Sequence, residues 1–120
     1  MYITITNSRE LLRIHPSSVV CIQSDGNYSS FMLSGGVQEV VSMQLGLIEE
    51  LLNRQLNHEA NCFIRIGRSW IINREKVYKI IPSEGVLMLR DGDNKPFQTA
   101  QLSTEALKKL KAIMEQGDQK

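Results

Sequence analysis

The chain has 120 residues, of which 42% are apolar and 22% charged, with a mean hydropathy of −0.21 and a formal net charge of +1. This length fits one domain with a core of its own, and every apolar run is shorter than the ~18 residues that a membrane-spanning helix needs. The N-terminus lacks the basic and apolar segments of a signal peptide, so we expect one cytosolic domain that does not enter a membrane.

The first part of the chain alternates short apolar runs with turn signals, which predicts antiparallel strands. Asp25-Gly26-Asn27 is the strongest turn signal because Asp-Gly favours tight hairpins. Pro16 ends an earlier strand because proline cannot donate to a strand ladder. The strands expected before residue 42 are Tyr2–Thr6, Leu11–Ile14, Val19–Ile22, Tyr28–Leu33 and Val37–Val41.

The hydrophobic period then changes from two to that of a helix. Leu45, Ile48 and Leu52 lie at positions i, i+3 and i+7, which predicts an amphipathic helix that runs to about Arg54. Ser42 is well placed as its N-cap. Residues 55–61 are polar and predict a loop.

Strand signals return in the second half, and a terminal helix follows them. The expected strands are Phe63–Ile66, Trp70–Ile72, Val77–Ile81, Val86–Leu89 and Lys95–Thr99. The terminal helix begins near Ser103, with Leu107, Leu110 and Met114 at helical spacing. Many short strands with frequent turns predict a mainly β domain of small antiparallel sheets, sandwich-like, with two helices.

Charge is distributed unevenly along the chain. Residues 1–60 carry three basic against six acidic side chains, whereas residues 61–120 carry eleven against seven. Within 61–80 there are five basic residues and one acidic residue. Such a basic segment suits phosphate contact, although a solvated surface would have the same composition.

The sequence offers little for catalysis or metal binding. Cys21 and Cys62 form no CxxC pair, so we expect two reduced cysteines that pack as small apolar residues; a disulfide would be unusual in a reducing cytosol. His15 and His58 are the only histidines and stand in loop contexts. Asp91 begins a turn that lacks the bidentate glutamate of a calcium loop. Nucleophile motifs and glycine-rich phosphate loops are missing, so we expect no enzyme, no metal and no cofactor.

The most informative segment is residues 63–73. In an extended chain Arg65 points to one face and Arg68 to the other, and Gly67 between them permits a sharp change of backbone direction. Arg68 and Ser69 would then stand on a loop, where an arginine fork can reach phosphate or a guanine edge. Four other positions have a structural alternative: Arg65 could pair with an acidic residue, Trp70 could belong to the core, Tyr28 could be exposed or packed, and Asn73 could cap the turn that follows it.

This segment resembles the signature of the LytTR family of bacterial transcriptional regulators, which reads roughly Phe-x-Arg-x-His-Arg-Ser-Tyr/Phe-Ile/Val-Val-Asn. The positions that fit are Arg65, Arg68, Ser69, Trp70, Ile71 and Asn73. Three further stretches are similar to the family: the strand and Asp-Gly-Asn-Tyr hairpin at 20–28, the helix at 43–54, and the late hairpin at 87–92 before the terminal helix. The resemblance covers about residues 5–115.

The resemblance implies a β-rich response-regulator output domain that reads the major groove with loops. It implies double-stranded DNA as the partner, with a homodimer on repeated half-sites as one arrangement. Relatives usually carry a receiver domain as well, for which 120 residues leave no room. Carried over by position, the DNA-facing residues are Asn27, Tyr28, Ser29, Ser30, Arg65, Gly67, Arg68, Ser69, Ala100 and Gln101.

Several positions depart from the family pattern. Gly67 replaces the usual histidine, and Ala100-Gln101 stands where many members have an arginine. The first hairpin has no lysine or arginine. Because each lost cation weakens phosphate contact, a protein-interaction module with weakened DNA binding is the alternative function.

Overall fold

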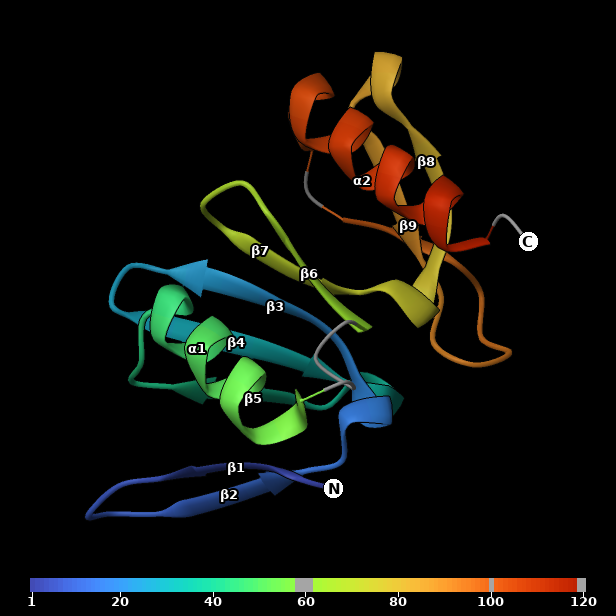
Figure 1. Ribbon diagram of the computed structural model, residues 1–120. Helices are drawn as coiled ribbons and strands as arrows, with labels where there is room; N and C mark the ends of the chain where they lie inside the picture. Colours follow the sequence, from blue (N-terminus) through green and yellow to red (C-terminus); the bar gives the residue numbers. More distant parts are fainter. Residues whose placement is uncertain (58–61, 100, 119–120) are drawn as a thin grey trace.

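The computed structural model describes residues 1–57, 62–99 and 101–118, and these residues form three antiparallel sheets and two helices (Figure 1). The sandwich-like, β-rich fold expected from the sequence is confirmed. The two-stranded sheet contains β1 (Ile3–Thr6) and β2 (Leu11–Ile14); the five-stranded sheet has the order β5 (Gln38–Val41), β4 (Tyr28–Leu33), β3 (Val19–Asp25), β7 (Trp70–Asn73), β6 (Phe63–Ile66); the third has the order β10 (Phe97–Gln98), β9 (Val86–Leu89), β8 (Val77–Ile81). The helices are α1 (Leu45–Leu56) and α2 (Thr104–Asp118).

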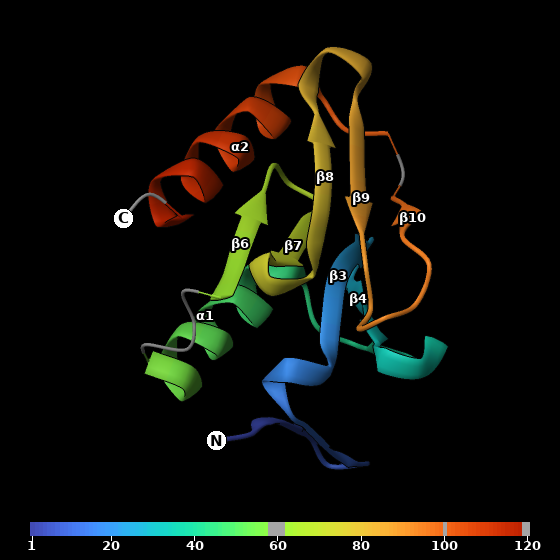
Figure 2. The same cartoon turned by 90° about the vertical axis from the view of Figure 1, so that its right-hand side faces the viewer.

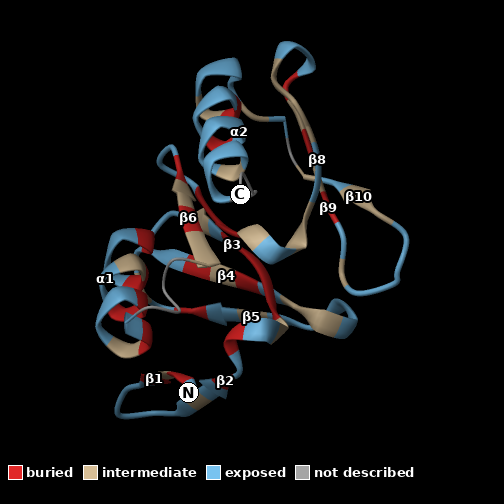
Figure 3. Cartoon of the chain, turned by 45° about the vertical axis from the view of Figure 1, so that its right-hand side comes forward, coloured by how far each residue is buried: buried red, intermediate tan, exposed pale blue. Residues whose placement is uncertain are grey.

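Strand β3 is the centre of the molecule. Its first four residues are each at most 2% exposed, and Figure 3 shows the strand buried along most of its length. A register shift between Val19 and Cys21 breaks the simple alternation of side chains. Val19 and Ile22 therefore enter one core, while Val20 and Cys21 enter the other. An uninterrupted apolar run suits this strand because both faces of the sheet are covered.

The two cores lie on opposite faces of the five-stranded sheet. On one face, Phe31 and Ile71 pack with α1 and the β1–β2 ribbon. On the other face, Ile72 packs with Leu89 of β9 and Leu107 of α2. Figures 1 and 2 show α1 beside the five-stranded sheet and α2 beside β8. Residues of β7 alternate between the two cores, which anchors this strand from both sides.

Helix α1 begins later than the sequence predicts. Its N-cap residue is Gln44 and makes no side-chain cap hydrogen bond, so the prediction of Ser42 as N-cap is wrong. The Met43 carbonyl accepts a hydrogen bond from the Ser29 hydroxyl at 2.6 Å. This tertiary hydrogen bond holds Met43 outside the helix, and it outweighs the local preference of serine for an N-cap position.

Other predicted boundaries need smaller corrections. β3 extends to Asp25, and β10 covers only Phe97–Gln98 rather than 95–99. Pro96 precedes β10 and has no N–H to donate, which shortens the pairing. The predicted cap of α2 is confirmed, because the Ser103 hydroxyl accepts from the Ala106 amide at 3.1 Å.

Cys21 is a buried free thiol. Cys21 is 2% exposed, and burial raises the pKa of its thiol to about 12. It therefore stays protonated and packs as a small apolar side chain, as expected. Cys62 differs from the expectation in being only half-buried.

Candidate nucleic-acid interface

The β6–β7 hairpin presents an arginine on a tight turn. Ile66 pairs with Trp70, so the connection consists of Gly67, Arg68 and Ser69 alone. Gly67 has a φ of +59°, a left-handed conformation that glycine adopts at no steric cost. All three turn residues are exposed. The turn therefore places the Arg68 side chain in solvent, as the sequence predicts.

Arg65, three residues earlier, is engaged with the protein itself. Its Nη1 donates to Glu49 Oε1 of α1 at 3.0 Å. Its Nε and Nη2 donate to the carbonyls of Gly67 and Arg68, each at 3.1 Å. Only 27% of the Arg65 side chain is exposed. The acidic pairing left open by the sequence is therefore present, and each guanidinium nitrogen already bonds a protein oxygen.

The β3–β4 hairpin provides a second exposed turn. Asp25 pairs with Tyr28, and Gly26 has a φ of +62°, so Gly26 and Asn27 form a two-residue connection. Asn27 is exposed, and Tyr28 is 50% exposed. The Asn27 Oδ1 accepts from Gln44 Nε2 at 3.2 Å. Sequence reasoning missed Gln44, because a glutamine before a helix has no distinguishing pattern.

The two serines of β4 do not share the exposure of this turn. Ser29 is fully buried, and its hydroxyl is the donor to the Met43 carbonyl. It therefore offers no exposed surface to a partner in this structure. Alternate residues of a strand point to opposite faces, and Ser29 lies on the buried face of β4. Ser30 is half-buried, and its Oγ accepts from Gln38 Nε2 at 2.6 Å.

The third expected region lies at the start of α2. Ala100 is outside the described residues. Gln101 is exposed, and its side chain lies against Gly85 in the β8–β9 turn, where a Cβ on the glycine would come within 3.0 Å of the Gln101 Cγ. This region is thus positioned by the third sheet rather than by the five-stranded one.

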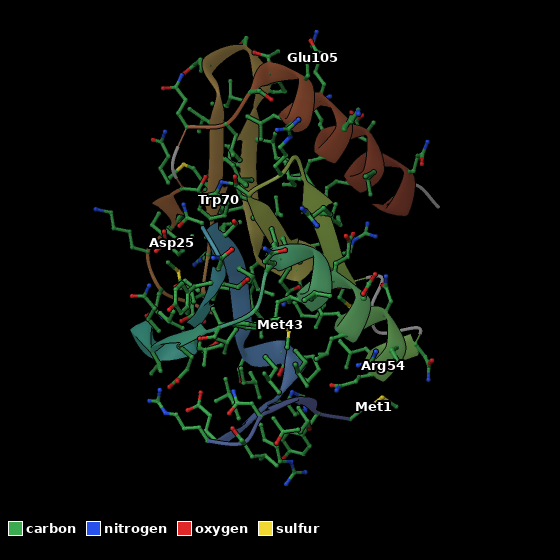
Figure 4. All side chains as sticks on the ribbon, turned by 90° about the vertical axis from the view of Figure 1, so that its left-hand side faces the viewer. Met1, Asp25, Met43, Arg54, Trp70 and Glu105 are labelled. Carbon is green, nitrogen blue, oxygen red and sulfur yellow. The ribbon has the colours of Figure 1, made fainter. Side chains whose placement is uncertain are left out.

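The structure brings the first two turns side by side although they are about 40 residues apart in the sequence. Gln23 pairs with Trp70, and the Ser24 amide donates to the Ser69 carbonyl at 2.8 Å. Figure 4 shows Asp25 and Trp70 at neighbouring ends of their strands. In Figure 1 both turns project to the left, and α2 begins above them. Neighbouring, exposed turns make one surface of residues 26–28 and 67–69.

Other residues singled out in the sequence have local roles. His15 is exposed, and its Nδ1 accepts from the Ser17 amide at 3.3 Å. His58 lies outside the described residues. The Asp91 carboxylate accepts from the Gly35 amide at 3.0 Å, and this bond, with one from the Ser34 hydroxyl, lowers the pKa of the carboxyl. These contacts fix turns away from the surface formed by residues 26–28 and 67–69.

Comparison with known families settles what kind of domain this is. The family model described as the LytTr DNA-binding domain matches residues 9–115. The chain belongs to the LytTR family. This is a family of DNA-binding domains, so a DNA partner in general follows from membership.

A solved structure supports the fold of this LytTR domain. The LytTr DNA-binding domain of a protein described as a methyl-accepting/DNA response regulator from Bacillus cereus matches with a TM-score of 0.63 and 16% identity. The match covers 94% of this chain and 95% of that one. A search of curated proteins gave no match. Among the described residues, none of the helices is long and apolar enough to cross a membrane.

Proposed function

We propose that this LytTR domain is a sequence-specific transcriptional regulator that contacts the major groove through its turns. The turn of residues 67–69 enters the groove with Arg68, and Asn27 and Tyr28 contact the neighbouring part of the duplex. Gln101 approaches DNA from the start of α2. Arg65 and the buried Ser29 are placed outside the direct contacts.

The observation that carries this proposal is the exposed arginine on a fixed turn. Arg68 is exposed, whereas the arginine three residues earlier is bonded to the protein. A guanidinium can donate two bonds to guanine O6 and N7, the commonest specific contact in the major groove. The adjacent Asn27 amide can donate and accept, which suits adenine. The two neighbouring turns can thus combine phosphate attraction with base recognition.

The test begins by finding the preferred sequence. A random duplex pool is selected on the purified domain, and binding of the enriched duplex and a scrambled duplex is measured by fluorescence anisotropy at two salt concentrations. We expect a preference for the enriched duplex of at least ~1,000-fold and an affinity that falls as salt rises. Stoichiometry on the enriched duplex distinguishes one domain per site from two on repeated half-sites.

Arg68→Ala should then weaken binding to the enriched duplex by about 1–3 kcal/mol and leave thermal stability nearly unchanged. Arg54→Ala is the matched control. It removes the same charge from an exposed position on α1, far from the labelled Asp25 and Trp70 (Figure 4). Normal binding by the Arg68 variant would contradict its role in recognition.

The alternative is a protein-interaction module that kept the fold with weakened DNA binding. The observation in its favour is that the exposed β3–β4 turn has no cation and the net charge is only +1. Failure of the pool to enrich any sequence, together with no binding to duplex DNA at low salt, would favour this alternative.

A further inference from the structure

Arg65 bonds the backbone of the turn of residues 67–69, which carries Arg68. It lies on β6, where alternation turns Phe63 toward the α1 core and Ile64 and Ile66 toward the other core. From this position its Nε and Nη2 reach the carbonyls of Gly67 and Arg68. One planar group therefore bonds two successive carbonyls of a three-residue turn, a geometry that a lysine ammonium cannot reproduce.

Glu49 fixes the guanidinium in turn. The Glu49 Oε1 accepts from Arg65 Nη1 at 3.0 Å. Glu49 stands on α1 beside the buried Ile48, so the helix that carries it is anchored in the core. The two side chains are 27% and 43% exposed, and ion pairs of such exposure contribute little to folding stability. The ion pair instead orients the Arg65 guanidinium toward the carbonyls of the turn.

The same helix also touches the other turn. Gln44, its N-cap residue, donates to Asn27, and the preceding Met43 carbonyl accepts from Ser29. α1 and the two residues before it thus contact the β3–β4 hairpin directly and, through the bond from Arg65 to Glu49, support the β6–β7 turn. These bonds add to the direct pairing of β3 with β7, which already holds the two turns side by side.

We infer that Glu49 and Arg65 are a positioning pair for DNA recognition: they hold the turn of residues 67–69 in its binding geometry, and Arg65 does not contact DNA. This inference rests on the proposed function. It separates Arg65 from Arg68, which the resemblance alone places together at the interface. It also adds Glu49, an acidic residue that charge considerations would assign to no DNA site.

Variants at position 65 distinguish positioning from contact. If Arg65 met a phosphate, Arg65→Lys would preserve the salt dependence and Arg65→Ala would reduce its slope by about one unit. If Arg65 positions the turn, both variants lose preference for the enriched over the scrambled duplex by about 5- to 150-fold, and the salt slope stays within half a unit of the wild type. A lysine variant with full preference would overturn the inference.

Variants on α1 supply the matched control. Glu49→Ala and Glu50→Ala each remove one negative charge from adjacent positions, and Glu50 is exposed. General electrostatic strengthening of DNA binding should appear in both. Only Glu49→Ala should lower the sequence preference, and Glu49→Gln should restore part of it because its amide oxygen can still accept from Arg65. Equal preference in the two alanine variants would overturn the role of Glu49.

A measurement without DNA separates this inference from the proposed function. Backbone order parameters of Gly67, Arg68 and Ser69 should fall from about 0.85 toward 0.6 in Glu49→Ala and in Arg65→Lys, and remain unchanged in Glu50→Ala. If the wild-type domain shows no sequence preference, the proposed function fails while these order parameters still decide whether the pair holds the turn. Unchanged order parameters in both variants would overturn the positioning role.

Discussion

Asn73→Ala tests whether the last residue of the family signature has a structural role. Asn73 is 2% exposed. Its Nδ2 donates to the Val19 carbonyl at 2.8 Å, and its Oδ1 accepts from the Glu75 amide at 3.0 Å. Removing the first bond leaves the buried Val19 carbonyl without its side-chain donor, at a cost of about 1–3 kcal/mol. Removing the second bond costs roughly 0.5–2 kcal/mol, the value typical of a lost cap. The cost is no larger because Glu75 is exposed, so water can replace the lost acceptor at its amide.

The two losses together predict a destabilisation of about 1.5–5 kcal/mol. With a urea m-value of about 2 kcal/mol/M, the unfolding midpoint should fall by roughly 0.8–2.5 M at constant m. Asn53→Ala, at an exposed position of α1, is the control and should leave the midpoint nearly unchanged. A loss below about 1 kcal/mol at Asn73, or lost DNA binding with full stability, would refute the cap argument.

Three further predictions test the core, a turn and the third DNA region. Trp70, the only tryptophan, is 8% exposed, so its emission should be blue-shifted and Trp70→Ala should cost about 3–5 kcal/mol in urea unfolding; solvent-like emission would contradict burial. Gly85 and Gly92 have φ values of +67° and +59°, but only a Cβ at Gly85 would meet a carbonyl, that of Leu102, at 3.0 Å. Gly92→Ala should therefore cost about 1 kcal/mol of unfolding free energy and Gly85→Ala at least about 1 kcal/mol more, and equal costs would count against the contact. Gln101→Arg should tighten non-specific DNA binding and steepen its salt slope by about one unit; an unchanged slope removes this position from the interface.

Much of the fold could be predicted because local signals and tertiary structure agree. The strands at 77–81 and 86–89 have the predicted bounds, since Pro82 and Gly85 mark the turn between them and apolar residues predominate in both. Trp70 lies in the core as its apolar neighbours indicate. Asn73 caps the turn after β7 because asparagine can bond the backbone two residues ahead.

The parts that could not be predicted depend on contacts between distant segments. Ser29 follows a turn and stands in a stretch with the polar composition of an exposed strand, yet the carbonyl of Met43, 14 residues later, accepts a hydrogen bond from its hydroxyl. The same contact moves the start of α1 away from Ser42. Gln44 next to Asn27 is likewise visible only once the helix is placed on the hairpin. No periodicity within one segment carries this information.

The contrast between Arg65 and Arg68 shows why net charge is a poor guide to this interface. The two residues have the same chemistry and lie on either side of Gly67, but a strand places one beside α1 and the left-handed glycine places the other in solvent. Salt dependence of DNA binding counts the phosphates that cations reach, not the sum of charges over the domain. A domain with a net charge of +1 can therefore bind DNA if its exposed cations are held where the phosphates lie. In the positioning we infer, Arg65 holds the turn that carries Arg68, and Glu49 on α1 orients Arg65.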